Sequence, residues 1–272
     1  MEKELKKRWI TSIIALPVLI YLIQFKEAFC VFIGLISIIA IYEYYSIFVL
    51  DLWKNDSIMI LGLLIAPAMI YFAYFGQVKE IMGLIFLNFL IGTIISSIKF
   101  SKDPDPPVKM CYQIFGTTYI PLLLTYVVLI RIKENGILWI YLMLLLVIAC
   151  DTGAYFTGKK IGRNKLCPAV SPGKTIEGFI GGLLLCIIAG LIYKFFLLPE
   201  VNWINCIILS SLVSVVGPLG DMFESMLKRT TNTKDSGSIL QGHGGILDRI
   251  DAMLFTAPVV YYFIEYIIKS NL

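Results

Sequence analysis

The segment IEGFIGGLLLCIIAGLIYKFFLL, residues 176–198, decides the fold class of this chain. Its charged residues are Glu177 near the start and Lys194 near the end, and the stretch between them is almost entirely apolar. A helix that crosses the hydrocarbon core of a bilayer needs about 20 mostly apolar residues. The segment therefore predicts a membrane-spanning helix.

Similar apolar runs fill most of the chain. Of its 272 residues, 58% are hydrophobic and only 15% are charged, whereas soluble domains carry about 25% charged residues. We expect an all-α, polytopic membrane protein with about nine transmembrane helices, at Trp9–Phe25, Ala28–Leu50, Ile58–Gly76, Ile81–Ile98, Cys111–Ile130, Ile137–Cys150, Ile176–Leu198, Val201–Leu219 and Ala252–Ile268. The sixth run is short, so it must either borrow the Gly-Ala-Tyr-Phe stretch after Asp151 or lie beside protein.

The organisation of the chain follows from its loops. No Ser- or Pro-rich linker divides it, which predicts a single membrane domain, 1–272. N-terminal helices occupy 1–140, and the remainder, 141–272, carries two long polar segments, 151–175 and 220–251. Cytoplasmic loops carry an excess of Lys and Arg, and a cytoplasmic N-terminus places 17 of the 23 basic residues on that side. Both polar segments then lie on the cytoplasmic face, where we expect them to form one site.

Composition also excludes several classes of protein. The net charge is +4 and the basic residues lie in loops rather than in an aromatic-interleaved stripe, so we expect no nucleic-acid partner. The six cysteines are scattered without a CxxC pair, which indicates small apolar side chains rather than disulfides or metal ligands. The basic start at Met1–Arg8 resembles a secretory signal, but no small-residue cleavage site follows, so this segment is predicted to begin the first helix.

Two pairs of carboxylates stand where predicted spans end. Asp221 and Glu224 are three residues apart, as are Asp248 and Asp251, so each pair shares one face of a helix. Carboxylates at a membrane boundary are costly unless paired or bound to a cation, and they mark functional sites. Because Mg²⁺ takes carboxylate oxygens together with phosphate oxygens, Asp221 and Asp248 are the predicted metal ligands, with Asp251 close by. The alternative is structural ion pairing, for example of Glu224 with Lys228 at i,i+4.

The same segment is rich in cations and glycines. Its basic residues provide positive charge for phosphate oxygens, although they also suit a positive-inside anchor: Lys228, Arg229, Lys234 and Arg249. Three glycines allow the backbone to approach an anion and present N–H groups to it: Gly242, Gly244 and Gly245. His243, the only histidine, is either a turn residue or a phosphate contact.

The earlier polar segment has a similar character. Ser171-Pro-Gly-Lys-Thr175 is predicted to form a turn that brings Lys174 and two hydroxyl groups to the start of the next helix, where free N–H groups favour an anion. It resembles the end of a Walker A motif but lacks the preceding glycine and strand, so we reject a P-loop.

Three further features concern the remaining chain. The Asp-Pro-Asp-Pro-Pro stretch in Ser101–Met110 predicts a stiff loop, since it cannot sustain a helix interior. Glu43 and Glu265 are carboxylates within apolar runs. Glu43 falls toward the cytoplasmic end of its helix, so its participation in the site stays open, whereas Glu265 falls toward the opposite face.

At this point the motifs resemble a known family. The pattern Ser225-x-x-Lys228-Arg229-x4-Lys234-Asp235-x-Gly237-x5-His243-Gly244-Gly245-x-x-Asp248-Arg249-x-Asp251 is similar to the C-terminal pattern of phosphatidate cytidylyltransferases, or CDP-diacylglycerol synthases. Asp151-Thr-Gly-Ala-Tyr, Ser171-Pro-Gly-Lys-Thr and Glu177-Gly resemble the same family. Gln241 departs from the family, which usually has Pro or Gly there, and this puts the stiffness of that turn in doubt.

The resemblance implies an enzyme of phospholipid biosynthesis that converts CTP and phosphatidate into CDP-diacylglycerol and pyrophosphate. It implies Mg²⁺, with K⁺ as a possible second cation, a homodimer, and a multi-pass protein of the cell (inner) membrane with its active site facing the cytoplasm. Asp221 and Asp248 would hold the metal. The expected catalytic residues are Lys228, Arg229, Lys234, Asp235, Arg249 and Asp251. The expected substrate-binding residues are Lys165, Ser171, Lys174, Thr175, Ser225, His243, Gly244 and Gly245.

Two other functions stay open from the residues alone. A CTP-dependent lipid-alcohol kinase would also need a metal and phosphate-binding loops, together with a base for its hydroxyl acceptor. A cation transporter would place its acidic residues near the middle of the membrane in broken helices, whereas here they cluster at one predicted face.

Overall fold

A computed structural model describes residues 17–48, 56–101, 105–231, 233, 236–237 and 244–268. The chain divides into two compact units, which are described separately: Met1–Ile132 with Thr233–Arg249, and Lys133–Asn232 with Ile250–Leu272. The boundary falls within α10 (Leu247–Phe263), after Arg249. The prediction of a single domain with parts 1–140 and 141–272 stays a prediction.

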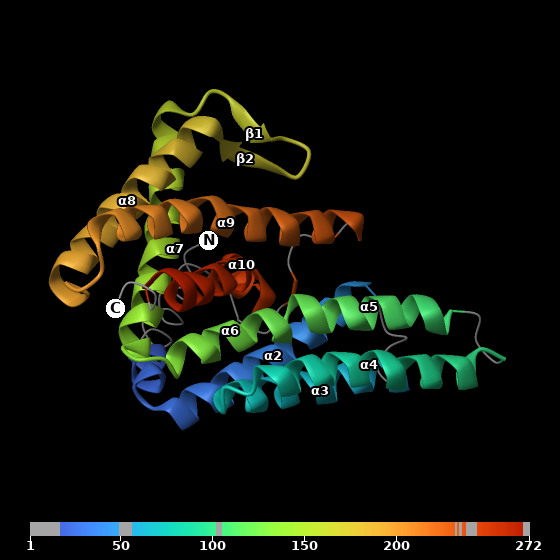
Figure 1. The fold of residues 1–272 in the computed structure, drawn as a ribbon. Coiled ribbons are helices and arrows are strands. Elements are labelled where there is room, and N and C mark those ends of the chain that lie inside the picture. The colour runs from blue at the N-terminus through green and yellow to red at the C-terminus, as the bar shows by residue number, and fades with distance from the viewer. Residues whose placement is uncertain are drawn as a thin grey trace. The chain divides into compact units, whose positions relative to one another are not determined.

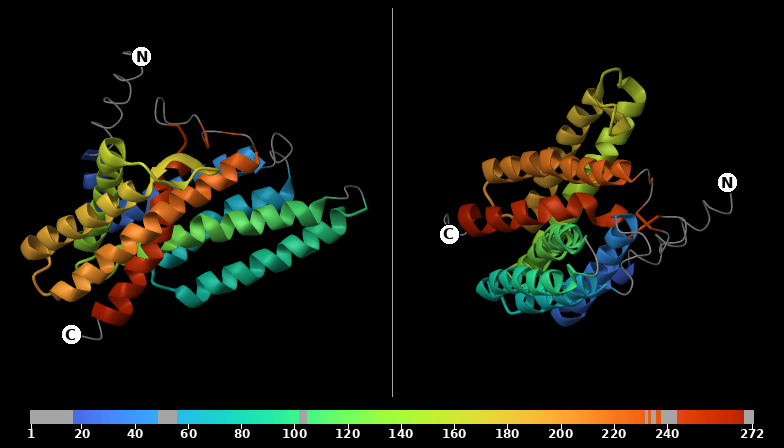
Figure 2. Two further views of the ribbon diagram at one scale, coloured as in Figure 1. Left: turned by 90° about the horizontal axis from the view of Figure 1, so that it is seen from above. Right: turned by 90° about the vertical axis from the view of Figure 1, so that its right-hand side faces the viewer.

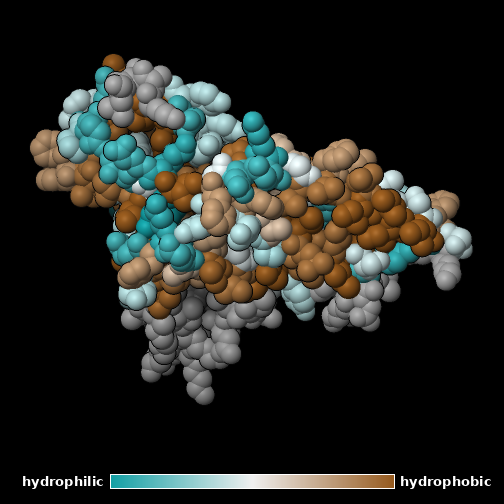
Figure 3. All heavy atoms as spheres, turned by 60° about the horizontal axis from the view of Figure 1, so that its bottom comes forward, coloured by the Kyte–Doolittle hydropathy of each residue, from teal (hydrophilic) through white to brown (hydrophobic). Residues whose placement is uncertain are grey.

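The described residues are predominantly helical, as predicted. Eight segments are long and apolar enough to cross a membrane, and they match the second to ninth predicted spans. Of the first predicted span, Trp9–Phe25, residues 9–16 lie outside the described residues, and residues 17–24 are helical. Many large hydrophobic side chains are exposed, and Figure 3 shows them as broad brown areas on one face. Such areas need lipid around them rather than water.

In the first unit, residues 17–24 are helical, and the helices that follow are α2 (Lys26–Phe48), α3 (Ser57–Tyr74), α4 (Val78–Lys99), α5 (Pro106–Tyr119) and α6 (Pro121–Arg131). α3 packs against α2, α4, α5 and α6, and these helices lie side by side in Figure 1 and in the two further views of Figure 2. Asp56 caps α3 by accepting a hydrogen bond from the N–H of Ile58 at 2.9 Å. The two ends of the predicted span Cys111–Ile130 belong to different helices, since Pro121 starts α6.

The prediction of a stiff loop over Ser101–Met110 is wrong for its second half. α5 begins at Pro106, so residues 106–110 are helical. Proline is tolerated in the first turn of a helix, because the N–H that it lacks has no helical partner there. The run of prolines therefore starts a helix instead of preventing one.

The second unit contains α7 (Gly136–Ile161), the strands β1 (Lys165–Cys167) and β2 (Ser171–Thr175), α8 (Ile176–Leu197), α9 (Trp203–Thr230), most of α10 and the π-helical turn η2 (Ile264–Ile268). α7 and α8 pack with their backbones nearly in contact. A Cβ atom added at Gly153 would lie 2.6 Å from the carbonyl oxygen of Gly181, and one at Gly182 would lie 2.8 Å from that of Cys150. Small residues allow this close approach of membrane helices.

Both polar segments differ from their predicted form. α7 continues through Asp151 to Ile161, so the short sixth span borrows the residues after Asp151. α9 likewise continues through Asp221 to Thr230. Ser171–Thr175, predicted as a turn, is instead the strand β2, which pairs antiparallel with β1. The prediction of a turn failed because a five-residue motif with Pro and Gly does not reveal whether a partner strand is present. Here β1 is that partner.

Candidate active site

The second unit contains a cavity of about 530 Å³, within the range of small-molecule sites. α7, the β1–β2 hairpin, α8 and α9 all contribute to its wall. The charged and hydroxyl-bearing side chains of the wall are those of Asp151, Tyr155, Lys159, Ser171, Lys174, Thr175 and Asp221. Residues of both polar segments therefore line one cavity, among them Ser171, Lys174, Thr175 and Asp221, and their roles in a site stay predictions.

Lys174 and Asp221 are the central pair of this cavity. The ammonium nitrogen of Lys174 lies 2.8 Å from a carboxylate oxygen of Asp221 and donates a hydrogen bond to the carbonyl of Pro218 at 3.0 Å. The hairpin positions Lys174, because β2 leads directly into α8. Thr175 caps that helix by accepting a hydrogen bond from the N–H of Gly178. Lys165, on β1, is exposed and is not among the residues that line the cavity.

Negative charge is concentrated around Asp221. The charge of Asp221 acts on the carboxylates of Asp151 and Asp251. The hydroxyl of Ser225 lies 3.4 Å from a carboxylate oxygen of Asp221. Sequence reasoning gave Asp151 no role. The sequence does contain a feature that indicates a role for Asp151: it directly follows an apolar run, and a carboxylate at that position needs a partner or a cation.

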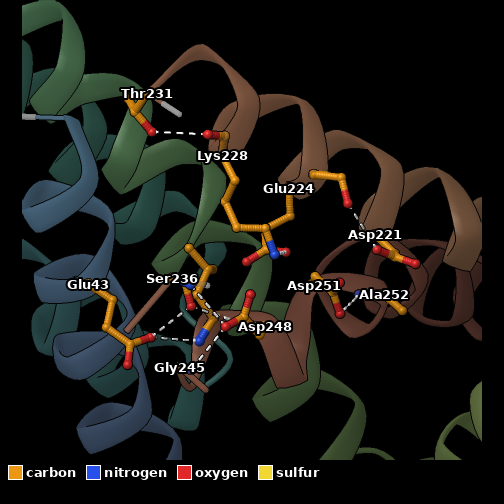
Figure 4. A network of polar contacts seen from close by, with 12 residues as sticks. Glu43, Asp221, Glu224, Lys228, Thr231, Ser236, Gly245, Asp248, Asp251 and Ala252 are labelled. Carbon is orange, nitrogen blue, oxygen red and sulfur yellow. Dashed lines mark hydrogen bonds and ion pairs between the residues drawn. The ribbon is translucent and has the colours of Figure 1, made fainter. Parts of the chain in front are cut away.

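Lys228 has a nearby carboxylate partner. Its ammonium group lies 2.5 Å from the carboxylate of Glu224, whose side chain is only 1% exposed. The i,i+4 ion pair considered from the sequence is therefore present. Arg229 is exposed on the same helix. Figure 4 shows Glu224 and Lys228 on α9, together with Asp221 one turn earlier.

Asp248 belongs to the first unit and makes backbone contacts there. One carboxylate oxygen accepts hydrogen bonds from the N–H groups of Ser236, at 3.0 Å, and Gly245, at 2.9 Å. Gly244 has a φ of 81°, which glycine adopts readily. The N–H of Gly245, which we expected to face a phosphate, is thus donated to Asp248. Arg249, next along α10, is exposed.

Four residues that the sequence placed in the site lie outside the described part of the chain: Lys234, Asp235, Gly242 and His243. The predicted metal pair is also divided between the units, with Asp221 in the second and Asp248 in the first. The role of each as a ligand stays a prediction.

The acidic residues of the second unit fit a hard divalent cation. In the described ranges, no group of three or more His, Cys, Asp or Glu side chains is arranged to hold a metal by itself. Mg²⁺ does not require such a group, because it is commonly bound by one or two carboxylates and by substrate phosphates. Asp221, with two further carboxylates in electrostatic range, offers a ligand of this kind.

Comparison with known proteins identifies the family. Residues 6–267 match the cytidylyltransferase family. The chain is 30% identical to the phosphatidate cytidylyltransferase of Bacillus subtilis, over 95% of this chain and 97% of that protein. It is 33% identical to the phosphatidate cytidylyltransferases of Staphylococcus epidermidis and Staphylococcus aureus, over 94% of this chain and 97% of theirs. The chain belongs to the cytidylyltransferase family.

Proposed function

We propose that this protein transfers the cytidylyl group of CTP to phosphatidate, giving CDP-diacylglycerol and pyrophosphate. The observation that carries the proposal is the match, over nearly the whole length of both chains, to relatives named phosphatidate cytidylyltransferase. The cavity of the second unit is consistent with it, because carboxylates that suit a cation and a lysine that suits a phosphate line the same wall.

The reaction needs positioning and charge neutralisation rather than a base. A phosphate oxygen of phosphatidate forms a bond to the α-phosphorus of CTP, and the bond from that phosphorus to the pyrophosphate oxygen breaks. The attacking phosphate is already largely anionic near neutral pH, since its second pKa is about 6. In this proposal Lys174 binds triphosphate oxygens, and Lys228 and Arg229 stabilise the charge that accumulates on the leaving group.

We also propose a Mg²⁺ ion held by Asp221 and Asp248, with Asp251 nearby, and K⁺ as a possible second cation. When bound, Mg²⁺ would neutralise negative charge on phosphate oxygens. In this proposal the carboxylate of Asp221 first forms an ion pair with Lys174 and binds the cation after substrate arrives. Release of Lys174 toward the triphosphate would leave Asp221 available to the cation.

The proposal also covers the location of the protein and its oligomeric state. Among the described residues, eight helical segments are long and apolar enough to cross a bilayer, which supports a multi-pass membrane protein. We propose that it lies in the cell membrane with its active site on the cytoplasmic side, where CTP is available, and that it works as a homodimer. Phosphatidate would then reach the site from the surrounding bilayer.

Radiolabelled CTP tests the function with purified protein, phosphatidate and Mg²⁺. Label at the α-phosphorus should appear in the lipid product and label at the γ-phosphorus in pyrophosphate. Transfer of γ-label to a lipid alcohol would instead indicate the kinase, and nucleotide-independent cation flux in vesicles would indicate the transporter. Neither alternative is supported by the names of the relatives.

A further inference from the structure

Glu43 is a buried carboxylate whose contacts lie far away in sequence. It belongs to α2, near the end of that helix, and is 2% exposed. Its two carboxylate oxygens accept hydrogen bonds from the N–H groups of Ile246, at 3.0 Å, and Leu247, at 2.9 Å. These residues lie 203 and 204 positions further along the chain, at the start of α10. All of these groups belong to the first unit.

The contact satisfies a physical need on both sides. The first N–H groups of a helix have no helical partner, and the partial positive charge there favours an anion. A buried carboxylate in turn is tolerated only when hydrogen bonds replace its lost hydration. Glu43 therefore serves as the N-terminal cap of α10, although it is supplied by a different helix.

Ser236 joins this cap to Asp248. Its hydroxyl lies 3.4 Å from a carboxylate oxygen of Glu43 and 3.3 Å from the N–H of Asp248, while its own N–H donates to the Asp248 carboxylate at 3.0 Å. Figure 4 shows Glu43 pointing from α2 toward Ser236 and Gly245, with Asp248 beyond them. The position of Asp248 is thus fixed through contacts that end on Glu43.

Two glycines adapt the loop to this carboxylate. A Cβ atom at Gly237 would lie 2.5 Å from one oxygen of Glu43, and one at Gly245 would lie 2.6 Å from the other. The backbone at Gly237 and at Gly245 lies close to the two oxygens of Glu43. The loop therefore encloses the carboxylate and also donates hydrogen bonds to it. A shift of Glu43 would therefore disturb the residues on both sides of Asp248.

We infer that Glu43 is a positioning residue that holds Asp248 in its place through Ser236 and the start of α10. This inference rests on the proposed function, in which Asp248 is a metal ligand. It assigns to the N-terminal helices a direct part in arranging the site. Residues that orient a ligand typically contribute about 10- to 100-fold to metal affinity or activity.

Glu43→Gln is the decisive variant, because it preserves size but leaves one acceptor oxygen where two are used. We expect kcat to fall about 10- to 100-fold and the Mg²⁺ concentration for half-maximal activity to rise several-fold, with the KM for phosphatidate unchanged. Hydrogen exchange supplies a readout independent of activity: the amides of Ile246 and Leu247 should exchange faster in the variant, whereas amides of α8 should not.

Glu265→Gln is the matched control, since it makes the same chemical change in η2. Glu265 pairs with Lys133 and is not part of this network. If Glu43→Gln lowers activity without changing the Mg²⁺ requirement, or leaves exchange at 246 and 247 unchanged, the residue is merely structural and the inference fails. Where Glu43→Gln does not fold, Ser236→Ala decides, and an unchanged Mg²⁺ requirement in that variant overturns the inference.

These outcomes are separable from failure of the proposed function. A wild-type protein that does not convert CTP and phosphatidate contradicts the function, and the exchange measurement then still tests whether Glu43 holds the start of α10. An active wild type with an unaffected Glu43→Gln variant contradicts the positioning role alone.

Discussion

Carboxylates of the two units use their oxygens in different ways. In the first unit, Glu43 and Asp248 accept hydrogen bonds from backbone N–H groups. In the second, Asp221 meets side chains, Lys174 and Ser225, at the wall of a cavity. The backbone contacts fix a loop in place, whereas side-chain contacts can be exchanged for a ligand. Asp221 and Asp248, which belong to the same polar segment of the sequence, therefore differ in their partners: the backbone holds Asp248, whereas side chains meet Asp221.

The largest expected effect is on activity, in the second unit. Asp221→Asn keeps the size of the side chain and a contact to Ser225 but removes the charge that faces the cavity. We expect turnover to fall about 10²- to 10³-fold with the melting temperature in detergent within a few degrees of wild type. Initial rates of CDP-diacylglycerol formation measure it. Glu200→Gln, at an exposed turn, is the control, and near-normal activity of Asp221→Asn would remove Asp221 from the site.

A smaller effect is expected at the partner of Asp221. Lys174→Met removes the ammonium group and should reduce kcat/KM for CTP roughly 10- to 100-fold, the value of one or two hydrogen bonds to a charged group. Lys160→Met is a suitable control, because Lys160 is exposed at the end of α7 and does not line the cavity. Equal losses in the two variants would indicate a general effect of positive charge rather than a phosphate contact.

In the first unit, a change at Asp248 should reduce stability as well as activity. Asp248→Ala leaves the N–H groups of Ser236 and Gly245 without this acceptor, at a cost of about 1–3 kcal/mol. Asp248→Asn keeps one acceptor oxygen and should be destabilised less, while losing activity to a similar extent. Denaturation in detergent ranks the variants. An Ala variant as stable as wild type would show that the loop does not depend on Asp248, and the contrast between the units would disappear.

The smallest expected effect concerns a carboxylate outside the spans. Burial by itself would raise the pKa of Asp56, but the N–H of Ile58 and the ammonium groups of Lys99, at 3.0 Å, and Lys109, at 3.4 Å, outweigh it, so the pKa is lowered. A lowered pKa in the folded state stabilises the fold above the ordinary value of about 4, and this contribution is lost as the pH falls below it.

Asp56→Asn tests this directly, because Asn still caps a helix. We expect the variant to be less stable than wild type by about 1 kcal/mol at pH 7, with the difference shrinking as the pH falls below about 4. Melting curves of both proteins across this range measure it. A difference that does not depend on pH would mean that the two lysines contribute little.

Prediction from sequence succeeded where one residue type dominates a long segment. The apolar runs identified all eight spans found among the described residues, and the spacing of Glu224 and Lys228 anticipated their ion pair. It failed for Ser171–Thr175 and for the start of α5, where the outcome depends on a partner strand and on the helix position of Pro106. Asp151 was missed as part of the cavity because the charged residues near it, Asp221 and Lys174, come from α9 and β2.

By itself, the sequence determined that this is a helical membrane protein, since about 20 consecutive apolar residues favour a helix in lipid whatever surrounds them. It also determined the chemical character of the site, because cations and carboxylates are concentrated in two segments. Only the tertiary structure decided which carboxylate has which task. Glu43 caps α10 from 203 residues away, because N–H groups at the start of a buried helix donate hydrogen bonds to whichever acceptor the packing of other helices brings to them.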